Sequence, residues 1–257
     1  MGISLVREGK VGLIKLDVPP ANSYTLDYYK ELNAIVSEIR FTPEIKVAVL
    51  LSEVPRFFSA GADIHYLRST DPVIKTQFCL LCNETLDMIA RSPQIFIACI
   101  EGHCVGGGLE MAMGCDLRFA GDSAGKIGLP EVTLGVLPGT GGTQRMARLV
   151  GKSKALDLCI TGETLTPQEA LAIGLVDRVF PQAEVRARTL AYAEKIAGSA
   201  AYAASNIKLS IMNGVEMPLN AAIRYEGELQ NLLFRSADAR EGIAAFLEKR
   251  PAQFQGK

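Results

Sequence analysis

Short apolar runs alternate with amphipathic stretches along the first two-thirds of the chain. Val47–Leu51 and Ile95–Ile100 are continuous apolar runs, which are typical of strands buried on both faces of a sheet. Leu26–Arg40 carries apolar side chains at three- and four-residue spacing, which predicts an amphipathic helix. The pattern also predicts strands at Ile3–Val6, Val11–Asp17, Leu117–Ala120 and Val176–Phe180, and a helix at Pro72–Arg91.

Beyond Gly142 the pattern changes to one helix after another. Thr166-Pro167-Gln168-Glu169 has the residues of a helix start, with Thr as the cap, Pro first and Glu third. Helices are predicted at Gln182–Gly198, Ala201–Asn213, Pro218–Arg235 and Ala237–Lys249. We therefore expect one α/β core over residues 1–195 and a helical region over residues 196–257, which we expect to pack on a neighbouring subunit.

The composition narrows the classes of partner. The chain has 257 residues and a formal net charge of -1, so bulk charge does not favour a nucleic acid or an anionic membrane as the partner. A local basic pocket for a phosphorylated ligand stays open. The sequence shows no secretory signal and no apolar run long enough to span a membrane, so we expect a cytoplasmic location.

The cysteines and the familiar binding motifs do not point to a metal or a nucleotide. Cys79 and Cys82 have metal-site spacing, but no second pair and no nearby histidine accompany them, so buried free thiols are expected. Gly139–Gln144 lacks the last glycine of a dinucleotide fingerprint, and Met146 stands where a P-loop before Lys152 needs its first glycine. No metal and no separate cofactor are predicted.

Two glutamates lie in turns rich in small residues. Glu110 follows three consecutive glycines, and Glu131 follows Gly128-Leu129-Pro130. A carboxylate among small and apolar residues is costly unless it has a partner or a task. Glu131 alone is equally well explained as a structural, salt-bridged carboxylate, and the glycines before Glu110 as tight packing of a helix on a strand.

A third turn, Arg56–Ile64, contains Ala60-Gly61-Ala62. Such small residues leave room for a ligand against the backbone, and the N–H of Ala62 could point toward it. The alternative is an ordinary strand-to-helix turn in which Asp63 caps the following helix.

These turns, taken in order, resemble the enoyl-CoA hydratase (crotonase) family. The resemblance runs essentially from end to end and is highly specific when the motifs are taken together. The motifs are Phe58-Ser59-Ala60-Gly61-Ala62-Asp63-Ile64, Gly106-Gly107-Gly108-Leu109-Glu110, Leu129-Pro130-Glu131 and Leu137-Pro138-Gly139-Thr140-Gly141-Gly142.

The resemblance implies an α/β fold, a spiral of β-β-α units with a helical trimerisation region, assembled as a homo-hexamer of two trimers. It implies an acyl-CoA thioester as substrate, with coenzyme A as part of that substrate. By position, the Ala62 and Gly107 N–H groups match the oxyanion hole. Glu131 matches the residue that supplies the C2 proton, and Glu110 matches the one that positions and deprotonates the water.

Contacts with coenzyme A follow from the same resemblance. Ala60, Ala62, Asp63, Ile64 and Gly107 match positions around the thioester, pantetheine and adenine. Phe246 and Lys249 match C-terminal residues that reach coenzyme A from a neighbouring subunit.

Two departures from the family pattern bear on specificity. The stretch Pro19–Tyr24 lacks the basic residue often found there, and the interval between Glu110 and Glu131 is one residue longer than in common hydratases, with Gly125 a plausible insertion.

Glutamates at both positions favour a hydratase over an isomerase, which commonly keeps one. We expect them to repel each other, so that one carboxyl pKa rises. Open alternatives are an isomerase, a hydratase or dehydratase for a branched or cyclic acyl group, and a catalytically inactive scaffold subunit. RNA binding through Leu26–Arg40 is disfavoured, because Lys30 and Arg40 face three acidic residues there.

Overall fold

The protein is built on two β-sheets, and successive strands of the chain are divided between them. The structure is a computed structural model, and it describes residues 2–256. The larger sheet has the order β1-β2-β3-β5-β7-β10, and the smaller has the order β4-β6-β8-β9. The larger sheet contains β1 (Gly2–Glu8), β2 (Val11–Asp17), β3 (Val47–Ser52), β5 (Ile95–Ile100), β7 (Leu117–Gly121) and β10 (Arg178–Phe180), and the smaller contains β4 (Phe57–Ser59), β6 (His103–Val105), β8 (Ile127–Gly128) and β9 (Thr164–Leu165).

Each repeat of the chain places one strand in each sheet. β3, β5 and β7 pair in parallel in the larger sheet, and the strands that follow them, β4, β6 and β8, pair in parallel in the smaller. Helices return the chain from one repeat to the next, which is the expected spiral of β-β-α units. The predicted fold class is confirmed.

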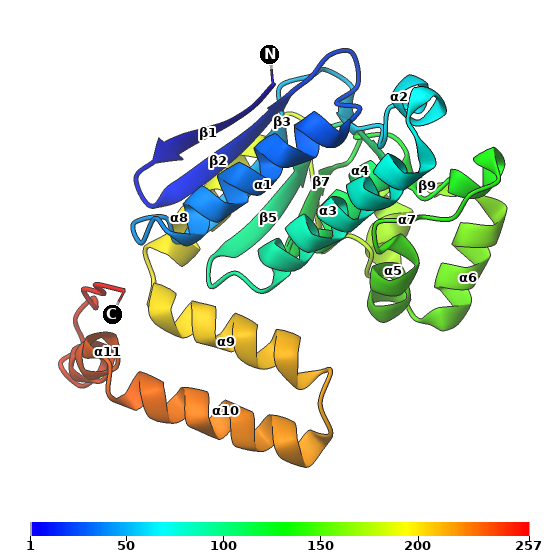
Figure 1. The fold of residues 1–257 in the computed structure, drawn as a ribbon. Coiled ribbons are helices and arrows are strands. Elements are labelled where there is room, and N and C mark those ends of the chain that lie inside the picture. The colour runs from blue at the N-terminus through cyan, green and yellow to red at the C-terminus, as the bar shows by residue number, and fades with distance from the viewer. Residues whose placement is uncertain (1, 257) are drawn as a thin grey trace.

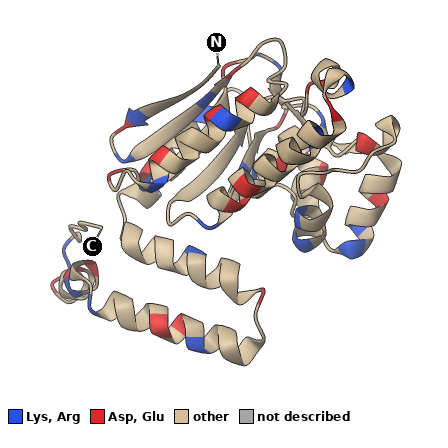
Figure 2. Cartoon of the chain, viewed as in Figure 1, with Lys and Arg blue, Asp and Glu red and all other residues tan. Residues whose placement is uncertain are grey.

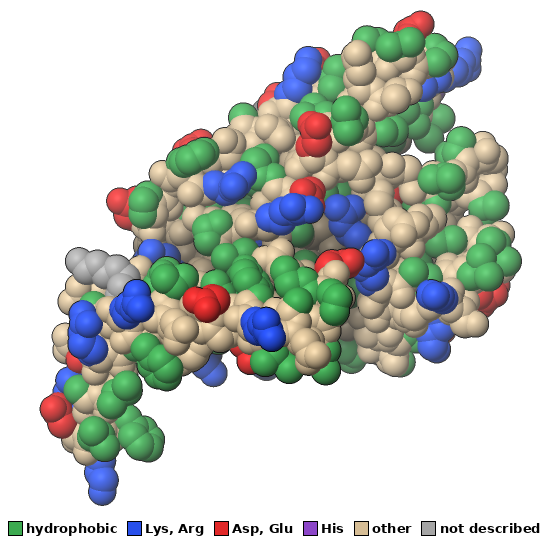
Figure 3. Space-filling model, turned by 60° about the horizontal axis from the view of Figure 1, so that its bottom comes forward, with side chains coloured by type: hydrophobic (Ala, Val, Ile, Leu, Met, Phe, Trp, Pro, Cys, Tyr) green, Lys and Arg blue, Asp and Glu red, His purple; other side chains and the backbone are tan. Residues whose placement is uncertain are grey.

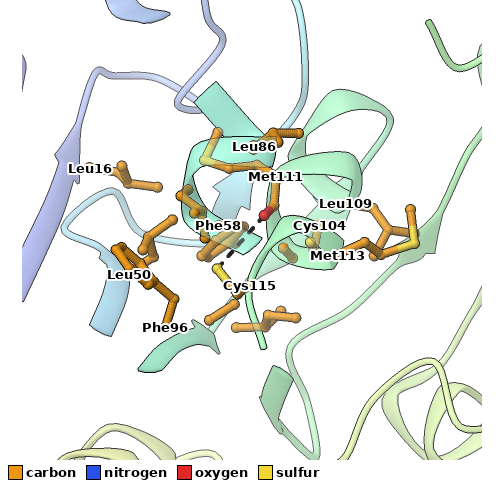
Figure 4. Close-up of a cluster of buried hydrophobic side chains, with 14 of the residues drawn as sticks. Leu16, Leu50, Phe58, Leu86, Phe96, Cys104, Leu109, Met111, Met113 and Cys115 are labelled. Atoms are coloured by element: carbon orange, nitrogen blue, oxygen red, sulfur yellow. Dashed lines mark hydrogen bonds between the residues drawn. The ribbon is translucent and has the colours of Figure 1, made fainter. Parts of the chain in front are cut away.

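Helices cover both faces of the larger sheet (Figure 1). α1 (Leu26–Arg40) and α3 (Pro72–Ala90) lie on one face, and α8 (Val185–Ala197) contacts the other. Because both faces are covered, every residue of β3 is buried, and its sequence is nearly all apolar. Figure 4 shows the core beneath α3, where Leu86 packs with Phe58, Phe96 and Met111.

The remaining helices complete the chain, and the last three of them form a C-terminal arm. They are α2 (Ile64–Ser69), α4 (Gly107–Gly114), η1 (Glu131–Leu134), α5 (Gly142–Val150), α6 (Lys152–Thr161), α7 (Pro167–Ala172), α9 (Ala201–Gly214), α10 (Leu219–Phe234) and α11 (Ala237–Leu247). The cap predicted at Thr166 is confirmed, since Thr166 and Glu169 bond each other's backbone N–H groups.

Some predicted boundaries were wrong at the ends of elements. The last strand is shorter than Val176–Phe180, because the N–H groups of Leu175 and Val176 both donate to Ala170 O at the end of α7. The helix that packs at the glycines, α4, begins at Gly107, within the triplet itself. The division predicted after residue 195 falls within the last turn of α8 and stays a prediction.

The C-terminal arm is attached to the core by a buried ion pair. Lys208 of α9 lies 2.8 Å from Asp116 and donates to the carbonyl oxygens of Ile89 and Gln94. Beyond this contact, α10 buries none of its residues, and it lies with α9 and α11 as an arm below the core (Figure 1).

Charges are mixed on the helix that was weighed as an RNA-binding element. Lys30 pairs with Asp27 at 3.1 Å on α1, and both red and blue stretches of ribbon occur along this helix (Figure 2). No helix among residues 2–256 is long and apolar enough to cross a membrane.

Candidate active site

The turn before α2 presents the N–H of Ala62. Tyr24 forms a parallel bridge with Ala62, in which the Tyr24 N–H donates to Gly61 O (3.0 Å) and the Tyr24 carbonyl accepts from Asp63 N (2.9 Å). Both bonds go to the residues on either side of Ala62, so its own N–H points away from Tyr24. The bonds of Gly61 and Asp63 hold Ala62 in place, and the bridge to Tyr24 leaves the Ala62 N–H free for a ligand.

A second donor lies beside this turn. Gly107 is the first residue of α4, and a helix leaves its first N–H groups without partners inside the helix. Gly61 has φ +88°, and a Cβ atom there would lie 2.9 Å from Gly107 N. The glycine at position 61 therefore brings the two turns together. A pair of adjacent N–H groups suits a developing oxyanion.

The members of the glycine triplet have different surroundings, and the packing role is confirmed for one of them. Gly106 has φ +57°, a conformation that favours glycine, and it turns the chain into α4. A Cβ atom on Gly108 would collide with Ser59 O, so this glycine permits tight packing of α4 on β4. Packing and donor presentation thus depend on different members of the triplet.

Glu110 is almost completely buried at 2% exposure and is held by three donors. The N–H groups of Thr140 and Gly142 donate to Oε1 at 2.8 and 2.7 Å, and the Thr140 hydroxyl donates to Oε2. Gly142 is the first residue of α5, so the positive end of that helix also faces the carboxylate.

Glu131 has the opposite environment. Its Oε1 lies against Gly106, where a Cβ atom would be 3.2 Å away. Its Oε2 is buried and has no hydrogen-bond partner among the residues that the structure describes. An unpartnered buried carboxyl oxygen is costly, and the carboxyl group that carries it lies against Gly106, the residue before α4.

The two carboxyl groups have raised pKa values, mainly for a reason other than the expected one. Burial raises the pKa of Glu131 to about 7, and the charge of Glu110 adds a smaller contribution. Burial also raises the pKa of Glu110, while hydrogen bonds from Thr140 and Gly142 and the charge of Arg145 oppose the rise. Mutual repulsion, the predicted cause, is secondary to desolvation.

The remaining predicted binding residues lie in two places. Ala60 and Ile64 flank the Ala62 turn, and Ile64 is 53% exposed. The Asp63 carboxylate accepts from Tyr66 N at 2.7 Å and caps α2, so the structural alternative for this side chain is confirmed. Phe246 lies in the last turn of α11 and Lys249 two residues beyond that helix, and α11 lies well apart from α4 in Figure 1. Their contacts with coenzyme A stay predictions.

The cysteines and Gly125, to which the sequence assigned no catalytic role, can be placed in the fold. All six cysteines are free, but the prediction of buried thiols holds only for four of them, because Cys79 and Cys159 are half-buried. No cluster of metal-binding side chains occurs among residues 2–256. Gly125, the possible insertion, lies against the His103 ring, whose Nδ1 accepts from Lys126 N at 2.8 Å. Its effect on the acyl pocket stays a prediction.

Tyr24 and Thr140 were not singled out as site residues by the sequence. Tyr24 is buried, and a Cβ atom on Gly107 would collide with its hydroxyl. Thr140 reaches Glu110 across thirty residues of chain. No local pattern marks either residue, because their roles come from contacts between segments distant in sequence.

Two neighbouring turns with N–H donors, beside one buried and one half-buried carboxyl group, suit an enzyme that stabilises an oxyanion while protons move next to it. A family model described as enoyl-CoA hydratase/isomerase matches residues 7–257, and the chain belongs to that family.

Relatives and solved structures agree with this assignment. The chain is 34% identical to the short-chain-enoyl-CoA hydratase of Clostridium acetobutylicum, covering 96% of this chain and 95% of that one. A probable enoyl-CoA hydratase of Rhizobium meliloti is 39% identical with the same coverage. A crystal structure of an enoyl-CoA hydratase from Geobacillus kaustophilus HTA426 is 69% identical, with a TM-score of 0.98 over 99% of this chain and 97% of that one.

Proposed function

We propose that this protein is an enoyl-CoA hydratase, which adds water reversibly across the C2=C3 bond of a 2-enoyl-CoA thioester. Curated relatives that are 34% to 39% identical over nearly the whole chain carry this name, which supports a hydro-lyase. The observation that carries the proposal is the contrast between the two glutamates. Glu110 is held by three donors, whereas Glu131 lies with Oε1 against Gly106 and keeps Oε2 without a partner among the described residues.

In the proposed mechanism, the thioester oxygen accepts hydrogen bonds from the N–H groups of Ala62 and Gly107. Glu110 accepts a proton from the water as the water oxygen bonds to C3. The C2=C3 pair of electrons moves into the enolate, and Glu131 delivers a proton to C2. The water supplies hydroxide to C3 and a proton to Glu110, and Glu131 supplies the proton at C2. The cycle closes when Glu110 loses its proton and Glu131 regains one through solvent, so atoms and charge balance over a turnover. A pKa of about 7 for Glu131 suits an acid that works near neutral pH.

We propose that the acyl-CoA lies along the turn at Ala60–Ile64, with its thioester between Ala62 and Gly107. Ile64 supplies exposed apolar surface where we propose that the substrate enters the site. Coenzyme A enters as part of the substrate, and the proposed chemistry needs no further cofactor. We also propose that the enzyme works in the cytoplasm.

A trimer-based homo-oligomer is proposed from the surface of the arm. α10 and α11 carry large apolar side chains that a single chain leaves open: Leu219 (73% exposed), Ile223, Phe234, Ile243, Phe246 (83% exposed) and Leu247. Figure 3 shows green side chains along this part of the surface. An apolar surface of this extent is typical of an interface. In such an assembly Phe246 and Lys249 would reach the coenzyme A of a neighbouring subunit.

The test is a hydration assay of the purified protein on a series of 2-enoyl-CoA thioesters that differ in chain length and branching. Hydration of crotonyl-CoA or of another member, with water added at C3, is the expected result. Conversion of a 3-enoyl-CoA to its 2-enoyl isomer with no hydration of any 2-enoyl-CoA would replace this proposal with the isomerase. No conversion of any of these thioesters would favour the scaffold subunit.

A further inference from the structure

The guanidinium group of Arg145 lies behind the loop that holds Glu110. Arg145 Nη1 donates to the Thr140 carbonyl oxygen at 2.8 Å. The N–H groups of Thr140 and Gly142 donate from the same loop to Glu110 Oε1, at 2.8 and 2.7 Å. The backbone of this loop therefore separates the cation from the carboxylate, with a carbonyl group directed at the first and two N–H groups directed at the second.

The glycine at position 141 makes this arrangement possible. Gly141 has φ +93°, and a Cβ atom there would lie 2.0 Å from Arg145 Nη1, so only a glycine admits the guanidinium against the backbone. Glycine also adopts positive and negative φ with similar ease, which lets the Thr140–Gly141 peptide unit turn over. Its carbonyl oxygen would then point toward the side of Glu110 and repel the carboxylate. The hydrogen bond from Arg145 restrains this unit in the favourable orientation.

The position of Arg145 is unfavourable for a cation unless an anion lies nearby. Arg145 stands near the start of α5, where the helix dipole disfavours positive charge. Burial lowers the pKa of Arg145, and the charge of Glu110 opposes that change. Asp87 of α3 also acts on Arg145, but it is paired with Arg91 at 2.9 Å. Glu110 is therefore the anion that accounts for a cation at this place.

We propose that Arg145 is a positioning residue for Glu110, acting through the Thr140 carbonyl group. By holding this carbonyl away from the carboxylate, the guanidinium keeps the N–H groups on either side of Gly141 directed at Glu110 Oε1. Its charge in addition favours the ionised carboxylate across the loop. The kinetic part of this proposal rests on the proposed function, in which Glu110 accepts a proton from water.

Other titratable and charged groups surround the two residues. Those that act on Glu110 or are acted on by it are Tyr24, Tyr29 of α1, Cys79 and Cys82 of α3, Glu131 of η1, and Cys159 of α6. Those that line one cavity with Arg145 are Asp87 and Arg91 of α3, Arg148 of α5, and Glu216 beyond α9. All of them stay in place when Arg145 is replaced, so the comparison concerns one guanidinium.

The experiment compares Arg145→Met with Arg148→Met in the full-length protein. Arg148 is the matched control, because it lies on the same helix and pairs at the surface with Glu216 at 3.0 Å. Arg145→Met is expected to lower kcat roughly tenfold, the effect of one charge-assisted hydrogen bond, with KM changed less than about twofold. The acid limb of the pH profile should move to higher pH, because Glu110 then ionises less readily. Arg148→Met should change neither.

Arg145→Lys is the conservative variant. Lysine keeps the charge but has a shorter side chain without the planar fork of arginine, so its kcat and acid limb should lie between those of wild type and Arg145→Met. If Arg145→Met does not fold, Arg145→Lys decides the matter by the same shift in smaller measure. A pH profile of Arg145→Met that coincides with that of Arg148→Met, or wild-type values for Arg145→Lys in that second case, would overturn the proposal.

Two readouts without catalysis separate this inference from the proposed function. NMR of protein labelled with carboxyl-¹³C glutamate titrates the Glu110 carboxyl group, with the signal assigned through Glu110→Gln. Hydrogen exchange reports on the amide protons of Thr140 and Gly142. A higher Glu110 pKa together with faster exchange in Arg145→Met supports the inference even if no enoyl-CoA is hydrated. An unchanged pKa contradicts it, and a higher pKa with unchanged exchange would show that Arg145 acts by charge alone and does not position the loop.

Discussion

The Glu131 carboxylate packs against Gly106, and a Cβ atom on that glycine would lie 3.2 Å from Glu131 Oε1. Gly106 is also the residue that turns the chain, at φ +57°, into the helix that begins with Gly107. One backbone turn thus brings the proposed proton donor and one oxyanion donor together. The predictions below follow from this arrangement and from the contacts of Glu110.

Substitutions of the two glutamates are predicted to have different effects in an assay of C2 proton exchange. A saturated acyl-CoA has no double bond to hydrate, but it can lose and regain a C2 proton at the enolate. Glu131→Gln should abolish this exchange in D₂O, whereas Glu110→Gln should retain most of it. Both variants should lose roughly 100-fold or more in hydration. Proton NMR of butyryl-CoA measures the exchange, and equal loss in both variants would contradict the assigned roles.

Hydration should weaken as the pH rises through about 7, the pKa to which burial raises Glu131. The reason is that the proton for C2 resides on Glu131, which ionises in this range. Hydration takes up no net proton, so the ratio of kcat/KM in the two directions is fixed by a pH-independent equilibrium constant, and dehydration should weaken over the same interval. Profiles of kcat/KM against pH in both directions measure this, and the limb near pH 7 should be absent from the residual activity of Glu131→Gln.

The same pKa predicts a change in stability. The folded pKa of Glu131 lies above the ordinary value of 4.5, so its contribution to stability is fully present below pH 4.5 and is lost as the pH rises through about 7. Glu131→Gln does not lose stability in this way, because glutamine does not ionise. The Tm of the variant relative to wild type should therefore increase between pH 4.5 and 8, and a constant difference would argue that Glu131 is not buried.

Gly142→Ala should impair catalysis by displacing Glu110. A Cβ atom at this position would lie 2.8 Å from Glu110 Oε1 and 2.6 Å from Pro138 Cβ, so the carboxylate or the loop must move. A displaced catalytic group costs on the order of 10- to 100-fold in rate. Gly214→Ala is the control, because its Cβ would make only an ordinary 3.6 Å contact with Ala222 and should leave kcat unchanged.

Lys208→Met should destabilise the attachment of the C-terminal arm. The substitution leaves Asp116 buried without its cation, and breaking a buried pair costs about 3–5 kcal/mol. Lys30→Met removes an exposed partner of Asp27 and should cost less than about 1 kcal/mol. Denaturant unfolding of both variants measures the difference, and similar midpoints would show that the buried pair is not what secures α9.

Ile223→Glu is predicted to dissociate the proposed oligomer. Ile223 is 56% exposed on α10, a helix with no buried residue in the single chain, and a charge in an apolar interface is costly. Phe41→Glu alters a side chain that is 80% exposed at the end of α1 and should leave the assembly intact. Sedimentation velocity distinguishes the two, and a monomeric wild type would contradict the proposal directly.

The periodic parts of the fold could be predicted from the sequence, and the short parts could not. α1 and β5 were predicted with the bounds that the structure has, because α1 is long enough to show the helical spacing and β5 is an unbroken apolar run. β8 and β9 contain two residues each, too few for any alternation to appear. The smaller sheet was therefore seen only as turns, and α2 only as the alternative in which Asp63 is a cap.

The sequence by itself determined which residue types stand in the site and in what order, and hence the family. Glu110, Glu131 and the glycines around them are local features, so a motif can carry them. Only the tertiary structure decided that Glu110 is fully hydrogen-bonded while Glu131 is not, and that Tyr24 reaches Gly107. Hydrogen bonding and desolvation depend on which atoms surround a group, and those atoms come from segments far apart along the chain.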